Sequence, residues 1–480
     1  MSVADFQPVI GLEVHAQLLT RSKIFCGCST EFGAPPNAHT CAVCLGMPGV
    51  LPVLNEKVVE YAVRVGRALE CRINPVSIWA RKNYFYPDLP KGYQISQYDQ
   101  PLCEHGGLEI DTDDGPKRIR ILRIHLEEDA GKNVHDAGGG ESLVDLNRSG
   151  VPLIEIVSEP DIRSSTEAAE YLKALRDVLV YLGVNDGNLE EGSFRCDANV
   201  SVMPKGSTKF GQRVELKNIN SFRFVQKAID YEIGRQVELV ESGGKVAMET
   251  RLFDAVRGET RSMRSKEEAH DYRYFPEPDL PPLRIPAGYV ERIERDLPEL
   301  PRAKLQRFSS AYALPAYDAR ILVGDRALAD LFEKVQAVYK GPAKKLSNWF
   351  LGELLRLMKE EATDVGALRF SPAQFASLLE MVDSGDLSNN AAKEVFAEMF
   401  RTGRSPREVA REKGLIQVQD SGAVDAAVEA VLAANPGEVE KYRSGKKQVL
   451  GFLVGQVMKA MKGKGNPALV NAALKAKLGD

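Results

Sequence analysis

The sequence of 480 residues lacks several features that would assign it to a common class of protein. No stretch approaches the ~18 apolar residues that a membrane-spanning helix requires. The N-terminal segment has neither a basic start nor an apolar core, so we expect no signal peptide. The phosphate-binding patterns GxxxxGK[ST] and GxGxxG are also missing. We therefore expect a cytoplasmic protein with no membrane partner, in which any nucleotide is held by sheet residues and a metal ion.

Composition predicts a globular protein of several domains. Hydrophobic residues make up 44% of the chain and charged residues 27%, as in ordinary globular proteins. At roughly 150 residues per domain, the length predicts about three domains. The net charge of −4 gives no hint of nucleic-acid binding by the whole chain, so any basic surface must be local.

The apolar pattern predicts an α+β region followed by helices. Strand-like runs cover 9–12 and 119–124, and turn-forming residues lie at 111–116 and 138–140. Helical spacing covers 56–69, 166–182, 221–240, 303–312, 327–339, 344–359 and 371–384. Strands without strict βαβ alternation favour an antiparallel sheet. We predict three domains: an antiparallel-sheet domain at 1–292, a helical domain at 293–406, and short helices at 407–480.

Four of the seven cysteines lie within one short segment. Cys26 and Cys28 form a CxC pair, and Cys41 and Cys44 form a CxxC pair. An odd total and this crowding argue against a secreted disulfide framework. Four thiolates around Zn²⁺ form a closed tetrahedral site of structural type. We predict structural zinc here; the alternative is four buried cysteines without metal.

Acidic residues interrupt three apolar, strand-like runs. Glu13 and His15 are two residues apart, so in a strand both project from one face. Glu127 and Glu128 follow the end of a second run, and Glu155 stands alone inside a third.

A buried, ionised carboxylate is unfavourable unless it is paired, hydrogen-bonded or bound to a metal. Carboxylates with one imidazole suit Mg²⁺, so these acids and His15 predict a magnesium site. The alternative is that each acid pairs with a nearby cation, such as Arg123, Lys132 or Arg148.

Polar residues also interrupt apolar surroundings at 190–199 and 215–221. The cations there, Arg195 and Lys217, are suited to neutralising phosphoryl oxygens. We predict that they contact the phosphates of a bound nucleotide.

The last 40 residues are strongly basic, with nine Lys or Arg side chains against the single acid Asp480. Four of these bases, Lys446, Lys447, Lys459 and Lys462, flank an apolar helical segment at 449–458 in which Gly451 and Gly455 would permit close helix packing. A basic face of this kind suits contacts to a phosphate backbone. The alternative is a solvated surface.

Ten ordered motifs along essentially the whole chain resemble those of one family. They lie at 10–15, 81–88, 93–97, 125–132, 144–148, 152–160, 195–200, 215–221, 271–278 and 451–459. Together they resemble the B subunits of aspartyl/glutamyl-tRNA(Asn/Gln) amidotransferases, the GatB family.

This resemblance implies a fold and a metal site. The fold is an N-terminal cradle domain related to glutamine synthetase and guanidino kinases, then a helical domain, then a tail of the YqeY type. The Mg²⁺ ligands match His15, Glu128 and Glu155, with Glu13 and Glu127 beside them as further catalytic residues. All four zinc cysteines of the family are present.

The resemblance also implies an activity. ATP phosphorylates the side-chain carboxylate of misacylated Glu-tRNA(Gln) or Asp-tRNA(Asn), and ammonia displaces the phosphate. A separate amidase (the glutaminase, or A, subunit) supplies the ammonia through a polar channel, and a small C subunit bridges the two. Glu13 or Glu127 takes a proton from the attacking ammonium, and the basic tail binds tRNA.

Two further points stay open in the sequence. Tyr84, Tyr86, Lys91 and Tyr93 suit either a terminal adenosine or the channel wall, and an aromatic mini-core is the alternative. Rival functions are a small-molecule carboxylate–amine ligase, against which the basic tail argues, and a zinc-containing RNA-binding protein, against which the acidic residues argue.

Overall fold

The computed structural model describes residues 5–134, 142–265, 272–417, 421–461 and 465–479. The chain divides into two compact units, Met1–Leu300 and Pro301–Asp480. None of the helices in the described ranges is long and apolar enough to cross a membrane. The turn predicted at 138–140 lies outside the described residues, and the three predicted domain boundaries stay predictions.

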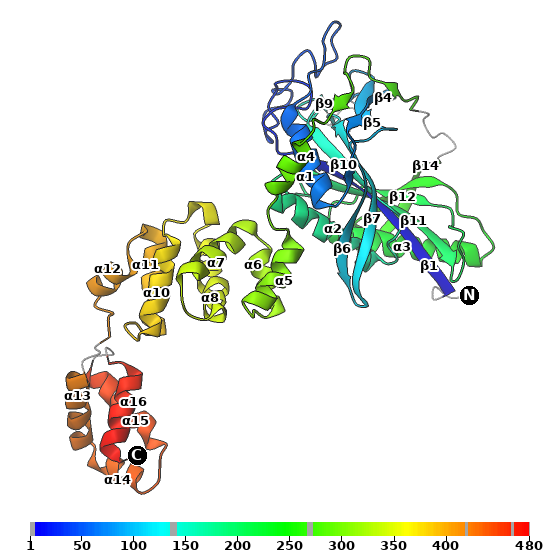
Figure 1. The fold of residues 1–480 in the computed structure, drawn as a ribbon. Helices are drawn as coiled ribbons and strands as arrows, with labels where there is room; N and C mark the ends of the chain where they lie inside the picture. The colour runs from blue at the N-terminus through cyan, green and yellow to red at the C-terminus, as the bar shows by residue number, and fades with distance from the viewer. Residues whose placement is uncertain (1–4, 135–141, 266–271, 418–420, 462–464, 480) are drawn as a thin grey trace. The chain divides into compact units, whose positions relative to one another are not determined.

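The first unit is built on a mixed set of strands and helices (Figure 1). Its strands are β1 (Phe6–Gln17), β2 (Arg72–Ile73), β3 (Val76–Ser77), β4 (Trp79–Asn83), β5 (Tyr93–Gln97), β6 (Cys103–Thr112), β7 (Gly115–Glu128), β8 (Lys132–Val134), β9 (Leu143–Asp145), β10 (Pro152–Ser158), β11 (Phe194–Pro204), β12 (Val214–Lys217), β13 (Glu249–Asp254), β14 (Glu259–Ser265), β15 (Phe275–Pro276) and β16 (Leu283–Arg284). Its helices are α1 (Glu56–Ala68), α2 (Ser165–Tyr181), α3 (Phe222–Glu241) and α4 (Tyr289–Arg295).

Nine of these strands form one sheet in the order β14-β13-β12-β11-β1-β10-β7-β6-β2. Every neighbouring pair runs antiparallel except β12 and β13, which are parallel. The predicted α+β class is therefore confirmed, and the predicted turn at 111–116 joins β6 to β7.

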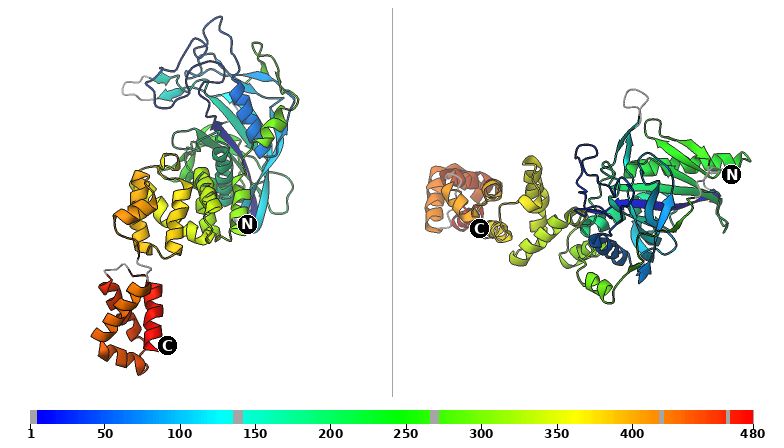
Figure 2. Two further views of the ribbon diagram at one scale, coloured as in Figure 1. Left: turned by 60° about the vertical axis from the view of Figure 1, so that its left-hand side comes forward. Right: turned by 90° about the horizontal axis from the view of Figure 1, so that it is seen from above.

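Strand alternation separates the apolar from the polar residues of this sheet. In β1, Leu12 and Val14 are buried in the main core, whereas Glu13 and His15 project from the opposite face. Helices α1, α2 and α3 contact the sheet and contribute to that same core (Figures 1 and 2). The three remaining cysteines, Cys71, Cys103 and Cys196, are buried in the core.

Helices α1, α2 and α3 of this unit begin at side-chain caps. Helix α2 starts after Ser164, whose hydroxyl accepts a hydrogen bond from the Glu167 N–H at 3.1 Å. Ser221 caps α3 in the same way, and Asn55 caps α1. The predicted bounds of these three helices differ from the observed ones by at most two residues.

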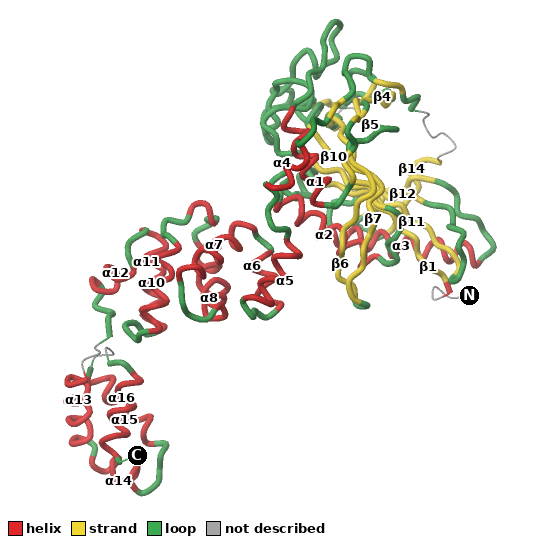
Figure 3. Tube along the Cα trace, in the orientation of Figure 1, coloured by secondary structure: helices red, strands yellow, loops and turns green. Residues whose placement is uncertain are grey.

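A long loop joins β1 to α1 and carries the four clustered cysteines (Figure 3). An isolated bridge between Ser22 and Ser29 closes the turn that presents Cys26 and Cys28. The turn that presents Cys41 and Cys44 is stabilised by a hydrogen bond from the Leu45 N–H to the Cys41 carbonyl at 3.0 Å.

The second unit is helical, as predicted from residue 293 onward. Its helices are α5 (Pro301–Ala311), α6 (Ala316–Val323), α7 (Arg326–Val338), α8 (Ala343–Trp349), η3 (Phe350–Leu354), α9 (Leu355–Glu360), η4 (Val365–Ala367), α10 (Pro372–Asp383), α11 (Asn389–Thr402), α12 (Pro406–Glu412), α13 (Ser421–Ala434), α14 (Pro436–Arg443), α15 (Val449–Ala460) and α16 (Pro467–Leu478). The helix predicted at 344–359 is the run α8-η3-α9, which contains one π-helical turn.

Helices α13 to α16 share a small core of their own. Leu453 and Val457 of α15 are buried in it. The close helix packing predicted at Gly451 and Gly455 is not found among the described residues. Both glycines are exposed, and apart from their chain neighbours and the backbone of their own helix no described atom lies within 4 Å of a Cβ built on either.

Candidate active site and metal centre

One face of the central sheet carries a row of polar side chains. The register pairs His15 of β1 with Glu155 of β10, and Glu155 with His125 of β7. On the other side of β1, His15 pairs with Arg195 of β11. Glu127 is two residues from His125 and shares its face. Four adjacent strands therefore present these side chains side by side. Within β1, Glu13 and His15 share one face, as their period-2 spacing predicts.

His15, Glu127 and Glu155 could hold one metal ion. His15 Nε2 lies 3.5 Å from a carboxylate oxygen of Glu155 and 4.0 Å from one of Glu127. Two ligands of the same Mg²⁺ ion, each about 2.1 Å from it, are at most about 4.2 Å apart. Both distances meet that limit, so the donor atoms and the geometry fit a hard divalent cation.

Two cations missed at the sequence level complete this cluster. His125 is buried, with Nε2 3.3 Å from Glu155 and 3.9 Å from Glu127. Burial lowers the pKa of His125, but the two carboxylates outweigh burial and raise it to about 9. Burial also lowers the pKa of Lys82, but Glu127, together with Glu155 and two tyrosines, outweighs burial, so the net shift is upward. The period-2 spacing from Glu127 would have pointed to His125, but no spacing pointed to Lys82.

Glu155 is the most strongly affected acid of the cluster. Burial raises its pKa, whereas His125 and His15 lower it, and the imidazoles prevail, so the pKa lies well below its ordinary value. Glu155 therefore stays ionised at neutral pH and is available to bind a cation.

The structure does not bring Glu128 to this cluster. Glu128 is the residue after Glu127, so its side chain leaves the opposite face of β7. Its carboxylate accepts hydrogen bonds from the Lys91 ammonium and, at 2.7 Å, from the Ile95 N–H. Glu128 is therefore paired with a cation, which is the alternative that the sequence left open. In the cluster with His15 and Glu155, Glu127 occupies the place where Glu128 was expected.

Glu13 lies on the same face as His15 and has a different environment from Glu155. It accepts a hydrogen bond from Asn199 Nδ2 at 2.9 Å. Burial and then the negative charges of Glu155 and Glu215 raise its pKa above the ordinary value. For Glu127, burial raises the pKa, but the hydrogen bond with His125 and the positive charges of Lys82 and His125 together outweigh burial, so the net shift is downward. Glu13 is therefore the more basic of the two candidate proton acceptors.

The two predicted phosphate-binding cations already have acidic partners. Arg195 donates from Nη2 to both carboxylate oxygens of Asp129 at 3.0 Å. Lys217 Nζ lies 2.6 Å from Asp197 and 3.2 Å from Glu215. Their side chains are 35% and 40% exposed, so both remain reachable by a ligand that approaches the polar face.

The aromatic residues of the 84–93 segment do not act as one group. Tyr84 packs edge-on against Tyr272, with ring centroids 6.1 Å apart. Tyr93 lies under the Arg81 guanidinium, 4.0 Å from its ring centroid, whereas Tyr86 is largely exposed. Lys91 is bound to Glu128. The mini-core interpretation fits Tyr84, and the choice between adenosine and channel stays a prediction.

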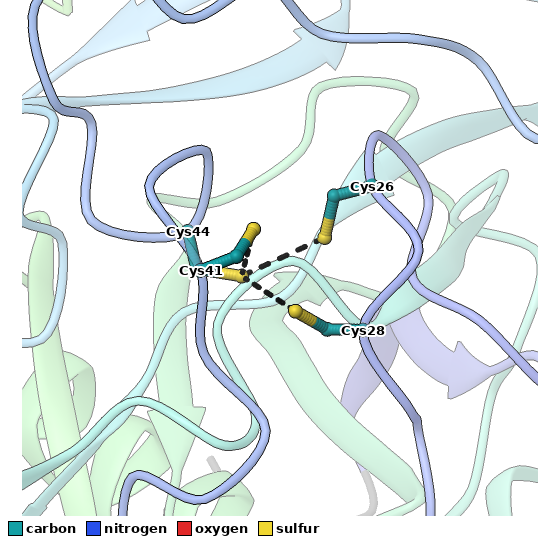
Figure 4. Close-up of side chains that lie close together, drawn as sticks. All are labelled: Cys26, Cys28, Cys41 and Cys44. Atoms are coloured by element: carbon teal, nitrogen blue, oxygen red, sulfur yellow. Dashed lines mark hydrogen bonds between the residues drawn. The ribbon is translucent and has the colours of Figure 1, made fainter.

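The four cysteines meet between two facing turns of the loop that joins β1 to α1, with their side chains directed at one another (Figure 4). The Cys44 sulfur lies 3.6 Å from that of Cys26, 3.8 Å from that of Cys41 and 3.9 Å from that of Cys28. In a tetrahedral site with Zn–S bonds of about 2.3 Å, neighbouring sulfurs are about 3.8 Å apart. The observed spacing therefore fits four-sulfur coordination of one zinc ion.

The tail lysines that the structure describes, among those predicted to bind tRNA, lie at the surface. Lys446, Lys447 and Lys459 are exposed, and the Lys447 ammonium lies 4.4 Å from the centroid of the Tyr442 ring. Lys462 lies outside the described residues. The three described lysines are accessible to a large ligand.

Comparison with known proteins gives a consistent result along the chain. Residues 8–291 match the family model described as GatB/GatE catalytic domain, and residues 330–478 match the model described as GatB domain. The chain is 72% identical to the aspartyl/glutamyl-tRNA(Asn/Gln) amidotransferase B subunit of Myxococcus xanthus, covering all of both chains. It is 63% identical to the protein of that name from an Anaeromyxobacter species, again over all of both chains. With the one from Thermodesulfovibrio yellowstonii it shares 59% identity over 97% of this chain and 98% of the relative.

Proposed function

Because the chain belongs to the family of aspartyl/glutamyl-tRNA(Asn/Gln) amidotransferase B subunits, we propose that it carries the kinase and amidation steps of that reaction. The substrate is Glu-tRNA(Gln) or Asp-tRNA(Asn), whose side-chain carboxylate takes the γ-phosphoryl group of ATP. Ammonia then displaces phosphate and leaves Gln-tRNA(Gln) or Asn-tRNA(Asn). The observation that carries this proposal is the full-length identity of 72%, joined to an acidic cluster able to hold a divalent cation.

In this proposal His15, Glu127 and Glu155 hold Mg²⁺, and Glu127 replaces Glu128 in the expected ligand set. The ion would offset the negative charge shared by the ATP phosphates and the substrate carboxylate. His125 and Lys82 supply the positive charge that keeps Glu127 and Glu155 ionised in a buried setting.

We assign the general base to Glu13. Ammonia arrives in equilibrium with ammonium, and only the neutral form attacks the acyl phosphate, so a proton must be removed. A raised pKa makes the Glu13 carboxylate the better acceptor, and Asn199 orients it. We also propose that two cations of the neighbouring strands bind the phosphoryl oxygens of ATP. Arg195 would give up part of its contact with Asp129 for this, and Lys217 part of its contact with Asp197.

The remaining parts of the assembly follow from the family. The first unit is proposed to be the cradle domain related to glutamine synthetase and guanidino kinases, and helices α13 to α16 the YqeY-type tail that binds tRNA. Ammonia comes from the glutaminase of the assembly, its A subunit, whereas the small C subunit joins the two larger chains. The complex works in the cytoplasm.

A single assay separates this function from its two rivals. The chain, assembled with its two partner chains, is given ATP and ammonium with uncharged tRNA, with Glu-tRNA(Gln), or with free glutamate. We expect ATP hydrolysis and amide formation with Glu-tRNA(Gln) only. Turnover of free glutamate would indicate a small-molecule ligase, and tRNA binding without ATP hydrolysis would indicate a binding protein.

The zinc site leads to a separate prediction. Purified protein is expected to contain one zinc ion per chain, and Cys26→Ser is expected to lower that content and the melting temperature, because a structural zinc site contributes folding free energy. Elemental analysis and thermal unfolding measure both quantities. Cys71→Ser, at a buried cysteine outside the cluster, is the control and should keep the zinc. A zinc-free preparation with full thermal stability and activity would contradict this part of the proposal.

A further inference from the structure

A lysine with no access to solvent lies beside the four cysteines. Lys23 is 0% exposed. Its Nζ donates to the carbonyl oxygens of His39 at 2.7 Å and Leu146 at 3.2 Å, and lies 3.4 Å from the Cys44 sulfur. An ammonium has three N–H donors, so these three acceptors occupy all of them. Neither carbonyl carries a charge, which leaves Cys44 as the one anionic partner among these three.

Burial of a cation with neutral partners alone is unfavourable. A zinc ion bound to four thiolates has the opposite deficiency, because its formal net charge is about −2. Lys23 and the four-sulfur centre would therefore offset each other's desolvation cost.

The backbone of Lys23 contacts the other half of the centre. Its N–H donates to the Cys28 carbonyl at 3.0 Å, inside the turn that the Ser22–Ser29 bridge closes. Lys23 thus touches the CxC turn through its main chain and the CxxC turn through its side chain. Through Leu146, the Lys23 side chain also contacts the segment that follows β9. The cysteine loop has a second hydrogen bond to this segment, from the His39 N–H to Asn147 Oδ1 at 2.8 Å.

We propose that Lys23 is the positioning residue of the zinc centre and sets the reactivity of Cys44. Its ammonium donates a charge-assisted N–H···S hydrogen bond to the Cys44 thiolate, which keeps that sulfur on the metal and protects it from electrophiles. This inference rests on the zinc part of the proposed function. A hydrogen bond to the sulfur lone pairs lowers their energy, so loss of the ammonium makes the thiolate more nucleophilic and moves its charge-transfer absorption to lower energy.

The test compares Lys23→Met, which removes the charge and keeps much of the side-chain length, with Lys57→Met, an exposed lysine on α1 that pairs with Glu60. Zinc content is measured first in the full-length chain. The rate of Cys44 alkylation by iodoacetamide is then followed by peptide mass spectrometry, and the sulfur-to-cobalt charge-transfer band is recorded after Co²⁺ substitution. In Lys23→Met we expect alkylation about tenfold faster, as loss of a charge-assisted hydrogen bond implies, and a band at lower energy. Lys57→Met should match the wild type.

A zinc-loaded Lys23→Met chain with the wild-type rate and band would overturn the proposal. A wild-type chain without zinc would overturn the zinc site itself, which is a different result. If Lys23→Met does not fold, Lys23→Arg and Lys23→Gln decide, because both keep hydrogen-bond donors and only arginine keeps the charge. Faster alkylation or loss of zinc in the glutamine variant alone supports the role of the charge, and equal behaviour of the two variants excludes it.

Discussion

Replacing Glu155 by Gln, or His15 by Ala, is expected to abolish both amidation of Glu-tRNA(Gln) and tRNA-dependent ATP hydrolysis. Both residues belong to the cluster whose donor atoms lie within reach of one ion. Losing a ligand removes charge stabilisation of several kcal/mol, which corresponds to a rate loss of about a thousandfold. The glutaminase activity of the partner amidase, measured in the same assembled complex, should persist and serves as the control for assembly.

A comparison of Glu127→Gln with Glu128→Gln tests the geometry more sharply. The two residues are adjacent, yet Glu127 faces His15 and Glu128 faces Lys91. We expect Glu127→Gln to match Glu155→Gln, with a raised Mg²⁺ requirement at any residual rate. Glu128→Gln should leave the Mg²⁺ requirement unchanged and should lower thermal stability, because it leaves the Lys91 ammonium buried without its partner. If Glu128→Gln instead raised the Mg²⁺ requirement and Glu127→Gln did not, Glu128 rather than Glu127 would be the metal ligand.

Glu60→Gln provides the baseline for these variants. Glu60 is an acid of the same unit that pairs with Lys57 on α1, away from the polar face of the sheet. It should keep the wild-type rate, Mg²⁺ requirement and melting temperature within error. Near wild-type amidation by Glu155→Gln would show that the cluster does not hold the catalytic metal.

The sequence predicts the partition of residues between faces wherever a strand alternates regularly. Glu13 and His15 are two apart, and their common face follows from the geometry of an extended chain alone. The same rule separates Glu127 from Glu128, so residue-level reasoning could have chosen between them once β7 was taken to continue to Glu128. The resemblance to the family made the other choice, because it placed Glu128 in the ligand set and Glu127 beside it.

Other parts of the site depend on long-range pairing that a single sequence does not contain. His125 reaches Glu155 only because β7 lies beside β10, and Lys82 reaches Glu127 from a different, three-stranded sheet. Arg195 likewise pairs with Asp129, which is far from it in the sequence, because the end of β7 brings Asp129 close to β11. The cysteine cluster is the opposite case, since two close pairs on one loop were sufficient to predict their meeting.

Deleting residues 421–480 is expected to weaken the binding of charged tRNA while leaving the chemical step in place. Helices α13 to α16 form their own core, so the deletion spares the core of the first unit and keeps α12, which contacts α10 and α11. The metal cluster and the cations of the polar face all belong to the first unit. We therefore expect the KM for Glu-tRNA(Gln) to rise about tenfold or more as phosphate contacts are lost, with slow amidation persisting at high tRNA concentration.

Charge reversal of single lysines should reproduce the deletion in graded form. Lys446→Glu, Lys447→Glu and Lys459→Glu replace exposed cations, and each lost phosphate contact should reduce the slope of log K against log salt by about one. Lys462→Glu is predicted to behave alike. Lys477→Gln is the matched control, because the Lys477 ammonium is already paired with Glu429 and should contribute less to the slope.

The competing view is that α13 to α16 only stabilise the rest of the second unit. Under that view the deletion lowers the melting temperature, and tRNA affinity measured well below that temperature does not change. Filter binding of charged tRNA at two salt concentrations separates the two views, because a phosphate-binding tail changes both the affinity and its salt dependence. An unchanged affinity and slope in the deletion variant would rule out the tRNA-binding role, whatever the melting temperature does.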